Sequence, residues 1–330
     1  MSGLKVDVII PALNAERWIY EAVKSTQEQT LAPARIIVVD DGSMDRTGEI
    51  VQSIASRDDR VSYIRIDQSG TSVARNTGIL YSSSEFIAFL DADDIWLPRK
   101  LELQMEVFSK SKRSLGFVHS SYFLMNEEGR HIKKARVFSP KLRGDLFLPI
   151  LHGYPVSGSA SSVVARRESL DKAGYFDGRL SFAEDWDLWI RLARVDGVDF
   201  TPEPVVGIRA HRASKQRSAD IHRKIVSFEN RLLVYQKWER FVAQDFRLKD
   251  NLRREAGVLA LRSLMRNPMG LRDLHQRLLV SSNPLARPLF LMERDLWKMV
   301  FLSLLEITIG RLWSSVRSLL GLKKRGGPGD

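Results

Sequence analysis

The segment Phe86–Pro98, which reads FIAFLDADDIWLP, joins an apolar run to a cluster of carboxylates. The run has the composition of a buried β-strand, and Asp91, Asp93 and Asp94 follow it directly. A strand end that only had to turn would more often use Gly, Asn or Pro. Neighbouring carboxylates repel one another unless a positively charged group lies between them. The segment therefore predicts a strand whose end is built to hold a cationic ligand.

Similar strand-like runs come earlier in the chain, and helix-length segments separate them. The apolar runs are KVDVIIP at 5–11, ARIIVVDDGS at 34–43 and RVSYIRI at 60–66. The expected helices cover 14–29, 45–57 and 72–81, and Asn14 is a candidate cap for the first. Continuous Val/Ile strands separated by helices indicate burial on both faces of a mostly parallel sheet. The predicted fold class is therefore α/β.

The middle of the chain mixes strands and helices less regularly. The pattern predicts a helix over 99–111, a hairpin over 115–132 that turns near Glu128 and Gly129, a strand and short helix over 160–174, a helix starting near Glu184, and a strand over 204–211. The stretch GYPVSGSASSVV, 153–164, departs from regular structure and has small residues that leave room for a substrate, although a packing loop explains it nearly as well.

Charge divides the 330-residue chain into two parts. The net charge is +11, and residues 1–215 contain equal numbers of basic and acidic side chains, so the whole excess lies in 216–330. We therefore expect a neutral unit over 1–215 and a basic, mainly helical unit over 216–330. The absence of cysteine excludes disulfides, thiolate zinc sites and cysteine nucleophiles. No signal peptide or membrane-spanning stretch is predicted.

Three polar motifs follow predicted strands of the parallel sheet. They are residues 11–14, 40–43 and 91–94. Ligands of such sheets bind outside the carboxyl ends of the strands. Mg²⁺ and Mn²⁺ are held by one or two carboxylates together with substrate phosphates. The motifs thus favour a metal–diphosphate site, and the alternative is that the aspartates only solvate a turn and cap the next helix.

Several stretches together resemble the family 2 glycosyltransferases, which have the GT-A fold. They are VIIPALNAERWIYEAVKSTQEQT, IIVVDDGSMDRT, GTSVARNTGI, FLDADDIWLP and, after a gap, SSVVARRESLDKAGYFDGRLSFAEDWDLWIRLA. The resemblance implies a Rossmann-like sheet flanked by helices, with a helical extension at the C-terminus. It also implies that the chain binds a nucleotide sugar, with a UDP-sugar as the expected donor, and transfers the sugar to a hydroxyl group.

The same resemblance assigns residues around the nucleotide. It places Asp41 on the imide of uracil, with Asp40 close by, and an acceptor carboxylate there would make a charge-assisted hydrogen bond. Pro11 and Ala12 would line the base and ribose, and Asn14 would lie nearby.

The resemblance also assigns a metal site. Asp91 would lie near the ribose, and Asp93 would bind the divalent cation, Mn²⁺ or Mg²⁺, that bridges the diphosphate. His211 is a further candidate ligand of this metal, although a lone histidine is more often structural. Arg75 is a candidate nucleotide contact, against the equally plausible interpretation of a surface arginine. Arg209 or Arg212 could instead neutralise the phosphates.

The acceptor site is expected at FAEDWDLWIRL, residues 182–192. By resemblance Asp185 is the base that removes the proton of the acceptor hydroxyl, and Glu184 orients the acceptor. Trp186 or Trp189 would give a sugar ring an apolar platform. General-base assistance contributes about 10²–10⁴-fold to such reactions. The alternative is that these acids only stabilise the first turn of a helix.

The basic unit ends in an apolar stripe at three- to four-residue spacing over 301–320. Such a helix can lie on an anionic membrane surface, which would suit a lipid-linked acceptor. Packing on the catalytic unit or a dimer contact explains the stripe nearly as well. The expected location is the cytoplasm, or the cytoplasmic face of the membrane as a peripheral protein.

The preferred hypothesis is a nonprocessive, inverting, metal-assisted glycosyltransferase that acts on a glycan or a lipid-linked acceptor. The QxxRW motif of processive relatives does not follow Asp185, since QKWER at 236–240 has the wrong order. A nucleotidyltransferase is disfavoured because PALNAERW lacks a glycine-rich phosphate loop. A nucleotide-binding or nucleic-acid-binding protein without transferase activity is the other alternative, but no nucleic-acid module is recognisable, so nucleic acid is not expected as a partner.

Overall fold

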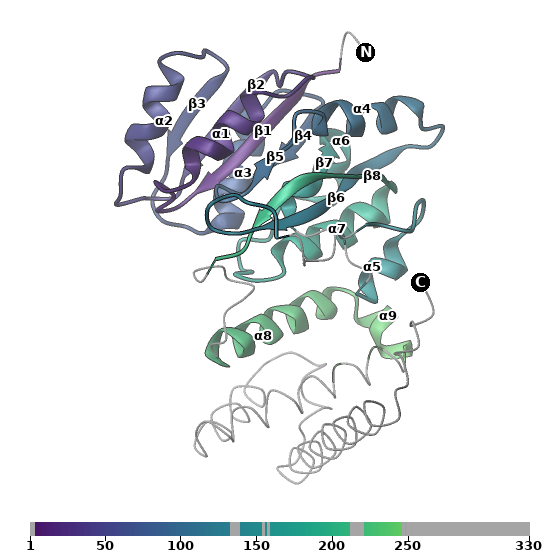
Figure 1. Ribbon diagram of the computed structural model, residues 1–330. Helices are drawn as coiled ribbons and strands as arrows, with labels where there is room; N and C mark the ends of the chain where they lie inside the picture. Colours follow the sequence, from purple (N-terminus) through teal and green to yellow (C-terminus); the bar gives the residue numbers. More distant parts are fainter. Residues whose placement is uncertain are drawn as a thin grey trace, which may run out of the picture. The chain divides into compact units, whose positions relative to one another are not determined.

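The computed structural model describes residues 4–132, 139–153, 156, 159–211, 221–245, 248 and 252. The chain divides into two compact units, Met1–Arg217 and Ser218–Asp330. The first contains the β-sheet (Figure 1). In the described part of the second, the helices are α8 (Ile221–Lys237) and α9 (Glu239–Gln244).

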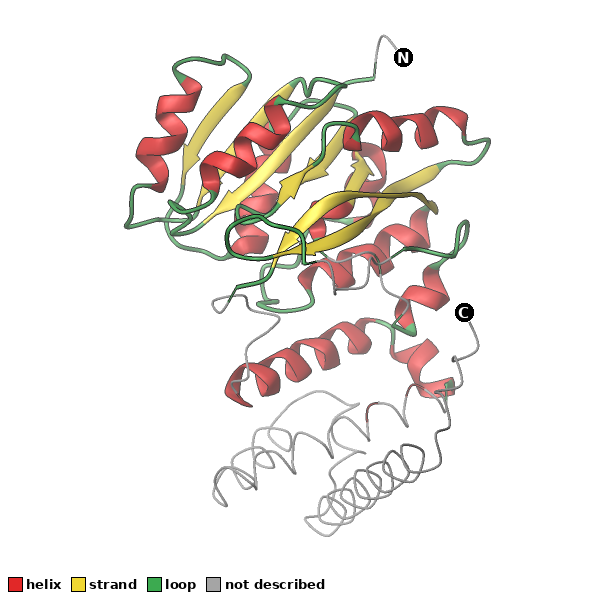
Figure 2. Cartoon of the chain, in the orientation of Figure 1, coloured by secondary structure: helices red, strands yellow, loops and turns green. Residues whose placement is uncertain are grey.

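The first unit alternates strands and helices along most of its length (Figure 2). Its strands are β1 (Val6–Ala12), β2 (Arg35–Asp40), β3 (Val61–Arg65), β4 (Phe86–Phe89), β5 (Ile95–Trp96), β6 (Leu115–Met125), β7 (Val163–Arg166) and β8 (Gly197–Arg209). Its helices are α1 (Ile19–Gln27), α2 (Thr47–Ala55), α3 (Thr71–Tyr81), α4 (Lys100–Lys110), α5 (Phe147–Leu151), the 3₁₀ turn η1 (Ala160–Ser162), α6 (Arg167–Ala173) and α7 (Glu184–Val195).

The strands form one eight-stranded sheet in the order β3-β2-β1-β4-β7-β6-β8-β5. Strands β3, β2, β1 and β4 are mutually parallel, as expected, and β6 pairs in parallel with β8. Strands β7 and β5 run antiparallel to their neighbours. The chain leaves β1 toward β2 and β3 and returns to the other side of β1 with β4. A crevice at the carboxyl end of the sheet is therefore expected between β1 and β4.

Both faces of the sheet are covered by helices. Helices α1, α2 and α4 lie on one face and α3, α6 and α7 on the other (Figure 1). Alternate residues of β2 show why, because Val38 packs in the cluster with α1 and α4 whereas Ile37 and Val39 pack with Ala74 of α3. The strand has a period of two residues, so an uninterrupted apolar run fills both cores.

Helix α3 approaches the sheet closely at Gly78. A Cβ atom on Gly78 would lie 2.5 Å from Cγ2 of Ile9 on β1, which is less than any ordinary contact. The missing side chain therefore sets the depth of α3 against the sheet.

The helix predicted over 14–29 begins later, and Asn14 does not cap it. Helix α1 starts at Ile19, and its N-terminus has no side-chain cap. Asn14 instead has a left-handed backbone, with φ of 48°. Its N–H donates to Ser43 Oγ, and its Oδ1 accepts from the N–H of Met44. These bonds tie the loop after β1 to the loop after β2.

The predicted hairpin is correct at its turn. The N–H of Asn126 donates to the carbonyl of Arg130, Gly129 has a φ of 76°, and Met125 forms an antiparallel bridge with His131. Before the turn, β6 pairs with β8 from Leu115 to Met125 and with β7 from Phe117 to His119.

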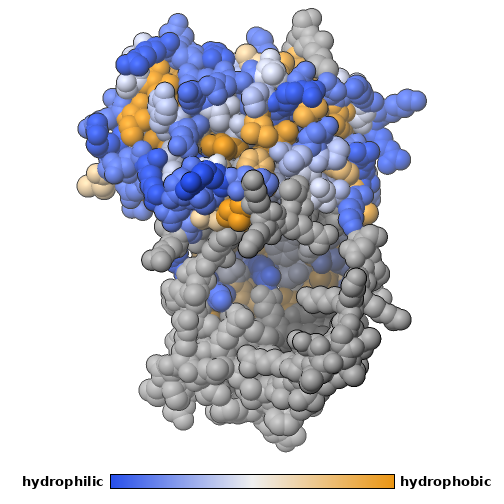
Figure 3. All heavy atoms as spheres, viewed as in Figure 1, coloured by the Kyte–Doolittle hydropathy of each residue, from blue (hydrophilic) through white to orange (hydrophobic). Residues whose placement is uncertain are grey.

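The surface of the first unit is mostly hydrophilic on the face shown in Figure 3. On the face shown in Figure 3, hydrophilic side chains surround smaller hydrophobic areas in the first unit. The apolar stripe over 301–320 lies outside the described residues. Within the described part of the chain, no helix is long and apolar enough to span a bilayer.

Candidate active site

A cleft of about 400 Å³ opens at the carboxyl end of the sheet. Its walls come from the loops after β1 and β4, from the end of β8, and from the N-terminal ends of α3 and α7. It collects most of the side chains predicted from the sequence, namely Pro11, Asn14, Arg75, Asp91, Asp93, Glu184, Asp185 and His211. Segments far apart in the sequence therefore share one cavity.

Ser161 holds the carboxylate loop after β4, residues 91–94, through hydrogen bonds to Asp91 and Asp94. The Ser161 hydroxyl donates to Asp94 Oδ2 at 2.6 Å, and its oxygen accepts the N–H of Asp91 at 3.0 Å. Asp94 is buried, and burial raises its pKa well above the ordinary value, reinforced by the charges of Asp93 and Asp91. Ser161 was not singled out by the sequence analysis, although the small-residue stretch that contains it was noted.

Arg209 at the end of β8 holds the same loop from another side. Its Nε donates to the carbonyl of Asp93, and its Nη1 to the carbonyl of Glu127, at 2.8 and 2.6 Å. Its Nη2 pairs with Glu21 on α1 at 2.6 Å. The side chain is only 1% exposed. The predicted role of Arg209 in neutralising phosphates therefore conflicts with its geometry, because its donors are already committed to protein groups.

His211 contacts one of the predicted metal ligands directly. Its Nε2 lies 2.8 Å from Oδ2 of Asp93, and its ring packs against that of Trp18 with centroids 4.5 Å apart. Trp18 also lines the cleft. The sequence analysis did not single out Trp18, because the residue that it contacts, His211, lies far away in the sequence.

Arg75 joins the two acidic sides of the cleft. Its Nη2 donates to Asp91 Oδ1 at 2.7 Å and its Nη1 to Glu184 Oε1 at 3.2 Å. The side chain is 5% exposed and its guanidinium lies over the ring of Phe176. Burial opposes its charge, but the carboxylates of Asp91 and Glu184 outweigh this and raise the pKa of Arg75. The surface-arginine alternative is therefore wrong.

Asp185 lies in the first turn of α7, as predicted. Ala183 precedes the helix with a left-handed backbone, φ 58°, and so turns the chain into the cleft. The N–H of Trp186 donates to Asp185 Oδ1 at 2.7 Å. Burial raises the pKa of Asp185 to about 6, as do the charges of Glu184 and Asp91, while Arg75 and the Trp186 N–H lower it. A carboxylate with this pKa is ionised at neutral pH and basic enough to accept a proton.

Three predicted nucleotide residues lie outside the cleft lining. Ala12 is buried, and its carbonyl accepts the N–H of Asp41. The Asp41 carboxylate accepts the N–H groups of Ser69 and Gly70 at the start of α3. Asp40 is fully buried and accepts from Ser43 N–H and from the hydroxyl of Tyr63. These two carboxylates hold the loops around the cleft, and their contact with a base stays a prediction.

The two tryptophans of α7 have separate surroundings. Trp189 is 2% exposed and packs between Phe89, Phe117 and Phe176. It belongs to the core, so its predicted role as a sugar platform is wrong. Trp186 is partly exposed, and its indole N–H donates to the carbonyl of Ile150.

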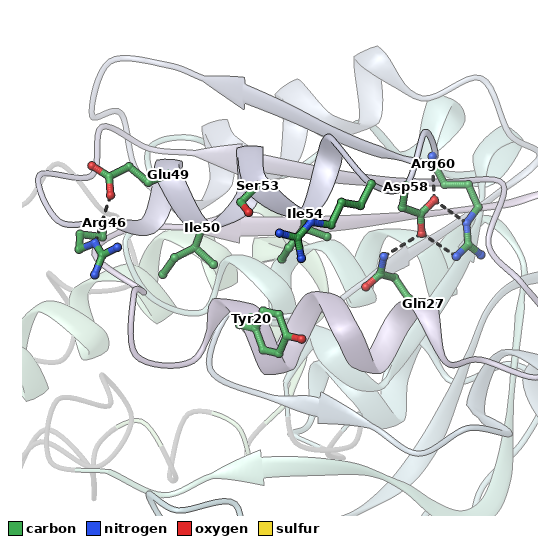
Figure 4. A pocket seen from close by; sticks show the side chains of 10 residues that line it. Tyr20, Gln27, Arg46, Glu49, Ile50, Ser53, Ile54, Asp58 and Arg60 are labelled. Atoms are coloured by element: carbon green, nitrogen blue, oxygen red, sulfur yellow. Dashed lines mark hydrogen bonds and ion pairs between the residues drawn. The ribbon is translucent and has the colours of Figure 1, made fainter.

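A second pocket, of about 500 Å³, lies between α1 and α2 and gathers none of the predicted residues (Figure 4). Its wall includes Ile50 and Tyr20, and two of its arginines are already paired. Arg60 pairs with Asp58 at 2.7 Å, and Arg46 with Glu49 at 3.1 Å. The carboxyl-end cleft is therefore the candidate active site.

The cleft suits a divalent cation that the substrate helps to hold. Among the residues that the structure describes, no three His, Asp or Glu side chains are grouped as metal ligands. The carboxylates of Asp91 and Asp93 nevertheless line the cleft together. Burial raises the pKa of Asp91, with Arg75 opposing and Asp93 adding to the rise, so a cation would relieve this repulsion. Two carboxylates plus phosphate oxygens are a usual ligand set for Mg²⁺.

Solved structures share the fold of the chain. Staphylococcus aureus TarS (residues 1–349) in complex with UDP-GlcNAc superposes with a TM-score of 0.57 at 15% identity, over 93% of this chain and 92% of that one. Its complex with UDP gives a TM-score of 0.54 at 16% identity, over 99% and 95% of the two chains. The likeness identifies the GT-A fold that the sequence predicted.

Curated relatives are closer in sequence. Escherichia coli WfgD, named a UDP-Glc:alpha-D-GlcNAc-diphosphoundecaprenol beta-1,3-glucosyltransferase, is 34% identical over 202 residues, which are 60% of this chain and 73% of WfgD. An uncharacterized glycosyltransferase of Rickettsia typhi is 31% identical over 218 residues, 65% of this chain and 66% of that protein. The chain covers between 26% and 66% of the length of five rickettsial relatives. The profile of Glycosyl transferase family 2 matches residues 7–172, and the chain belongs to that family.

Proposed function

We propose that the cleft binds a UDP-linked sugar and transfers the sugar, with inversion, to a hydroxyl of a glycan or lipid-linked acceptor. The observation that carries this proposal is that two acidic groups from distant segments of the chain line one cavity. Asp91 and Asp93 come from the loop after β4, and Glu184 and Asp185 come from the start of α7. One pair suits the diphosphate end of a donor and the other suits an acceptor.

Asp185 is the proposed base. Inverting transfer needs a group that takes the proton of the acceptor hydroxyl as its oxygen attacks the anomeric carbon. Asp185 lines the cleft, and its pKa is raised to about 6, chiefly by burial. A general base forms its hydrogen bond to the acceptor hydroxyl only when the substrate binds. Glu184, held by Arg75, is the proposed residue that orients the acceptor.

A divalent cation, Mn²⁺ or Mg²⁺, is the proposed cofactor. Asp93 and Asp91 would hold it, with His211 as a further ligand if its contact to Asp93 opens. When bound, the cation supplies the positive charge that stabilises the diphosphate leaving group. The residues of the chain bind and orient: Ser161 fixes the loop that carries both carboxylates, and Pro11 and Asn14 form the wall nearest β1.

The choice of a UDP-sugar is supported by the relatives. WfgD is named for UDP-Glc and a diphosphoundecaprenol-linked acceptor, and TarS has been crystallised with UDP-GlcNAc. A lipid-linked acceptor would also suit a C-terminal helix on an anionic membrane, with the protein at the cytoplasmic face. That surface contact, the nonprocessive mode of action and the division of roles between 1–215 and 216–330 are parts of the same proposal.

Calorimetric titration of the full chain with UDP and GDP, each with and without Mn²⁺, tests the donor site. We expect UDP to bind with Mn²⁺ and the Asp93→Asn variant to lose at least about tenfold in affinity, because the variant removes one charge at the cation. Asp59→Asn removes an exposed carboxylate on the loop between α2 and β3 and should leave binding unchanged.

The outcomes separate the parts of the proposal. Binding of GDP in preference to UDP would overturn the donor class. Absence of nucleotide binding under all four conditions would overturn the transferase function of this cleft. If UDP binds, release of UDP from UDP-glucose and UDP-GlcNAc, with and without candidate acceptors, identifies the sugar.

A further inference from the structure

Arg75 contacts both acidic groups of the cleft, Asp91 after β4 and Glu184 at the start of α7. Its guanidinium spans from Asp91 Oδ1 to Glu184 Oε1, with N–O distances of 2.7 and 3.2 Å. The two carboxylates lie 93 positions apart in sequence and belong to the proposed donor and acceptor ends, respectively. A single side chain of α3 therefore connects the two ends.

The arginine itself is rigidly placed. Its side chain is 5% exposed, and its guanidinium packs 5.0 Å from the ring centroid of Phe176. Phe176 is in turn held by Asn76, whose side chain exchanges hydrogen bonds with both backbone groups of Phe176 at 2.8 and 2.9 Å. Asn76 follows Arg75 on α3, so the helix fixes both the cation and the aromatic surface beneath it.

Charge balance gives the contact its importance. Asp185 is faced by Glu184 on its own helix, by Asp91 from the loop after β4, and by Arg75 from α3. Among these neighbours Arg75 is the one positive charge. Without it, three carboxylates would share a buried cleft, and each would resist ionisation of the others.

We propose that Arg75 is a positioning residue that joins the donor-side Asp91 to the acceptor-side Glu184 and supplies the positive charge that offsets Asp185. The inference rests on the proposed function for the roles of Asp91 and Asp185. A lysine keeps the charge but not the forked geometry, so it would reach one carboxylate at a time. The role therefore differs from that of a nucleotide contact, which would affect binding alone.

The first test measures stability against pH and requires no substrate. A carboxyl whose pKa is raised in the folded state binds more protons there than in the unfolded chain, so stability falls as pH rises through the interval between the two pKa values. Removal of Arg75 raises the folded pKa of Asp185 further. We therefore expect Arg75→Met to lower the urea midpoint slightly at pH 5 and roughly twice as much or more at pH 8.

Three further variants make this test specific. Arg75→Lys should recover most of the loss at pH 8. Arg75→Met combined with Asp185→Asn should lose part of the extra pH dependence, because Arg75 also faces Asp91 and Glu184. Arg167→Met removes an arginine whose described hydrogen bonds go to the carbonyls of Ile79, Ser82 and Ser84, so its deficit should be the same at both pH values.

The second test links Arg75 to the two substrates. With UDP-glucose or UDP-GlcNAc and Mn²⁺, UDP release by Arg75→Met should show its acidic limb shifted upward by about one pH unit relative to the unmodified chain, and Arg75→Lys should recover most of that shift. An equal urea deficit for Arg75→Met at pH 5 and pH 8 would overturn the inference. An unmodified chain that binds no nucleotide overturns the proposed function instead, and a pH-dependent deficit in that case would still support the joining of the carboxylates by Arg75.

Discussion

Lys100 carries a buried amine that the proposed reaction does not use. It is the first residue of α4, its side chain is fully buried, and its Nζ has no hydrogen-bond partner among the described residues. The ring centroid of Trp96 lies 3.7 Å away. Burial lowers the pKa of Lys100 well below its ordinary value of 10.5. We predict that Lys100→Met stabilises the protein at pH 7.

The magnitude follows from two opposing effects. An unsatisfied buried donor costs about 1–3 kcal/mol, and a cation over an indole ring returns up to about 2 kcal/mol, but only while the amine is charged. Because burial disfavours the charged amine, the return is small, and methionine, of similar shape, removes the cost. We expect the variant to gain about 1–3 kcal/mol in free energy of unfolding at pH 7.

The pH dependence of this gain has a definite sign. Above a pH of about 10.5 the amine is neutral in both the folded and the unfolded chain. As pH falls below that value, the unfolded chain takes up the proton more readily than the folded protein, whose Lys100 has a lowered pKa, so the unmodified protein loses stability. The gain of Lys100→Met should therefore grow from pH 10.5 to pH 7.

Urea unfolding followed by circular dichroism measures both quantities. Lys110→Met is the matched control, because Lys110 ends the same helix and its side chain is 73% exposed, so we expect a change of less than about 0.5 kcal/mol. A destabilised Lys100→Met variant at pH 7 would show that the contact with Trp96 dominates. A gain that does not vary between pH 7 and 10.5 would refute the lowered pKa of Lys100.

Other predictions concern the cleft. Arg209→Met should lower the free energy of unfolding by about 1–3 kcal/mol, because the part-buried carbonyls of Asp93 and Glu127 lose a donor, and should weaken UDP binding in calorimetry. Ser161→Ala should cost about 1–3 kcal/mol by urea unfolding, since Asp94 Oδ2 loses a donor and the Asp91 N–H loses its acceptor; an unchanged midpoint would contradict this. UDP release should fall about tenfold per pH unit below pH 6, where Asp185 becomes protonated, and pH-independent release between 5 and 7 would exclude Asp185 as the base.

Local patterns were sufficient for most of the fold. The strands β1 to β4 and the start of α7 at Glu184 lie where the apolar runs and first-turn acids predicted them. Both kinds of signal are contained within a few residues, since strand burial and helix N-termini depend on neighbours in sequence. The same holds for the turn at Gly129, whose φ of 76° suits glycine.

The failures share a different cause, which is contact between distant segments. Asn14 bonds to the loop 29 and 30 positions later instead of capping α1. Trp189 is enclosed by rings from β4, β6 and the loop after α6, so it cannot stack on a sugar. Arg209 bonds to Asp93 from 116 positions away. No window of local sequence contains these partners, and resemblance to a family named the residues without giving their hydrogen bonds.

Gly78 shows how an apolar contact limits the electrostatics of the cleft. The residue has no polar side chain and lies one turn after Arg75 on α3, where a Cβ would overlap Ile9 of β1. Any larger residue there would push the helix outward and carry the guanidinium away from Asp91 and Glu184. The distance over which the two acidic sides are bridged is therefore set by the thickness of a hydrophobic layer, and a change of one methyl group in that layer would act on the charge balance of the cleft.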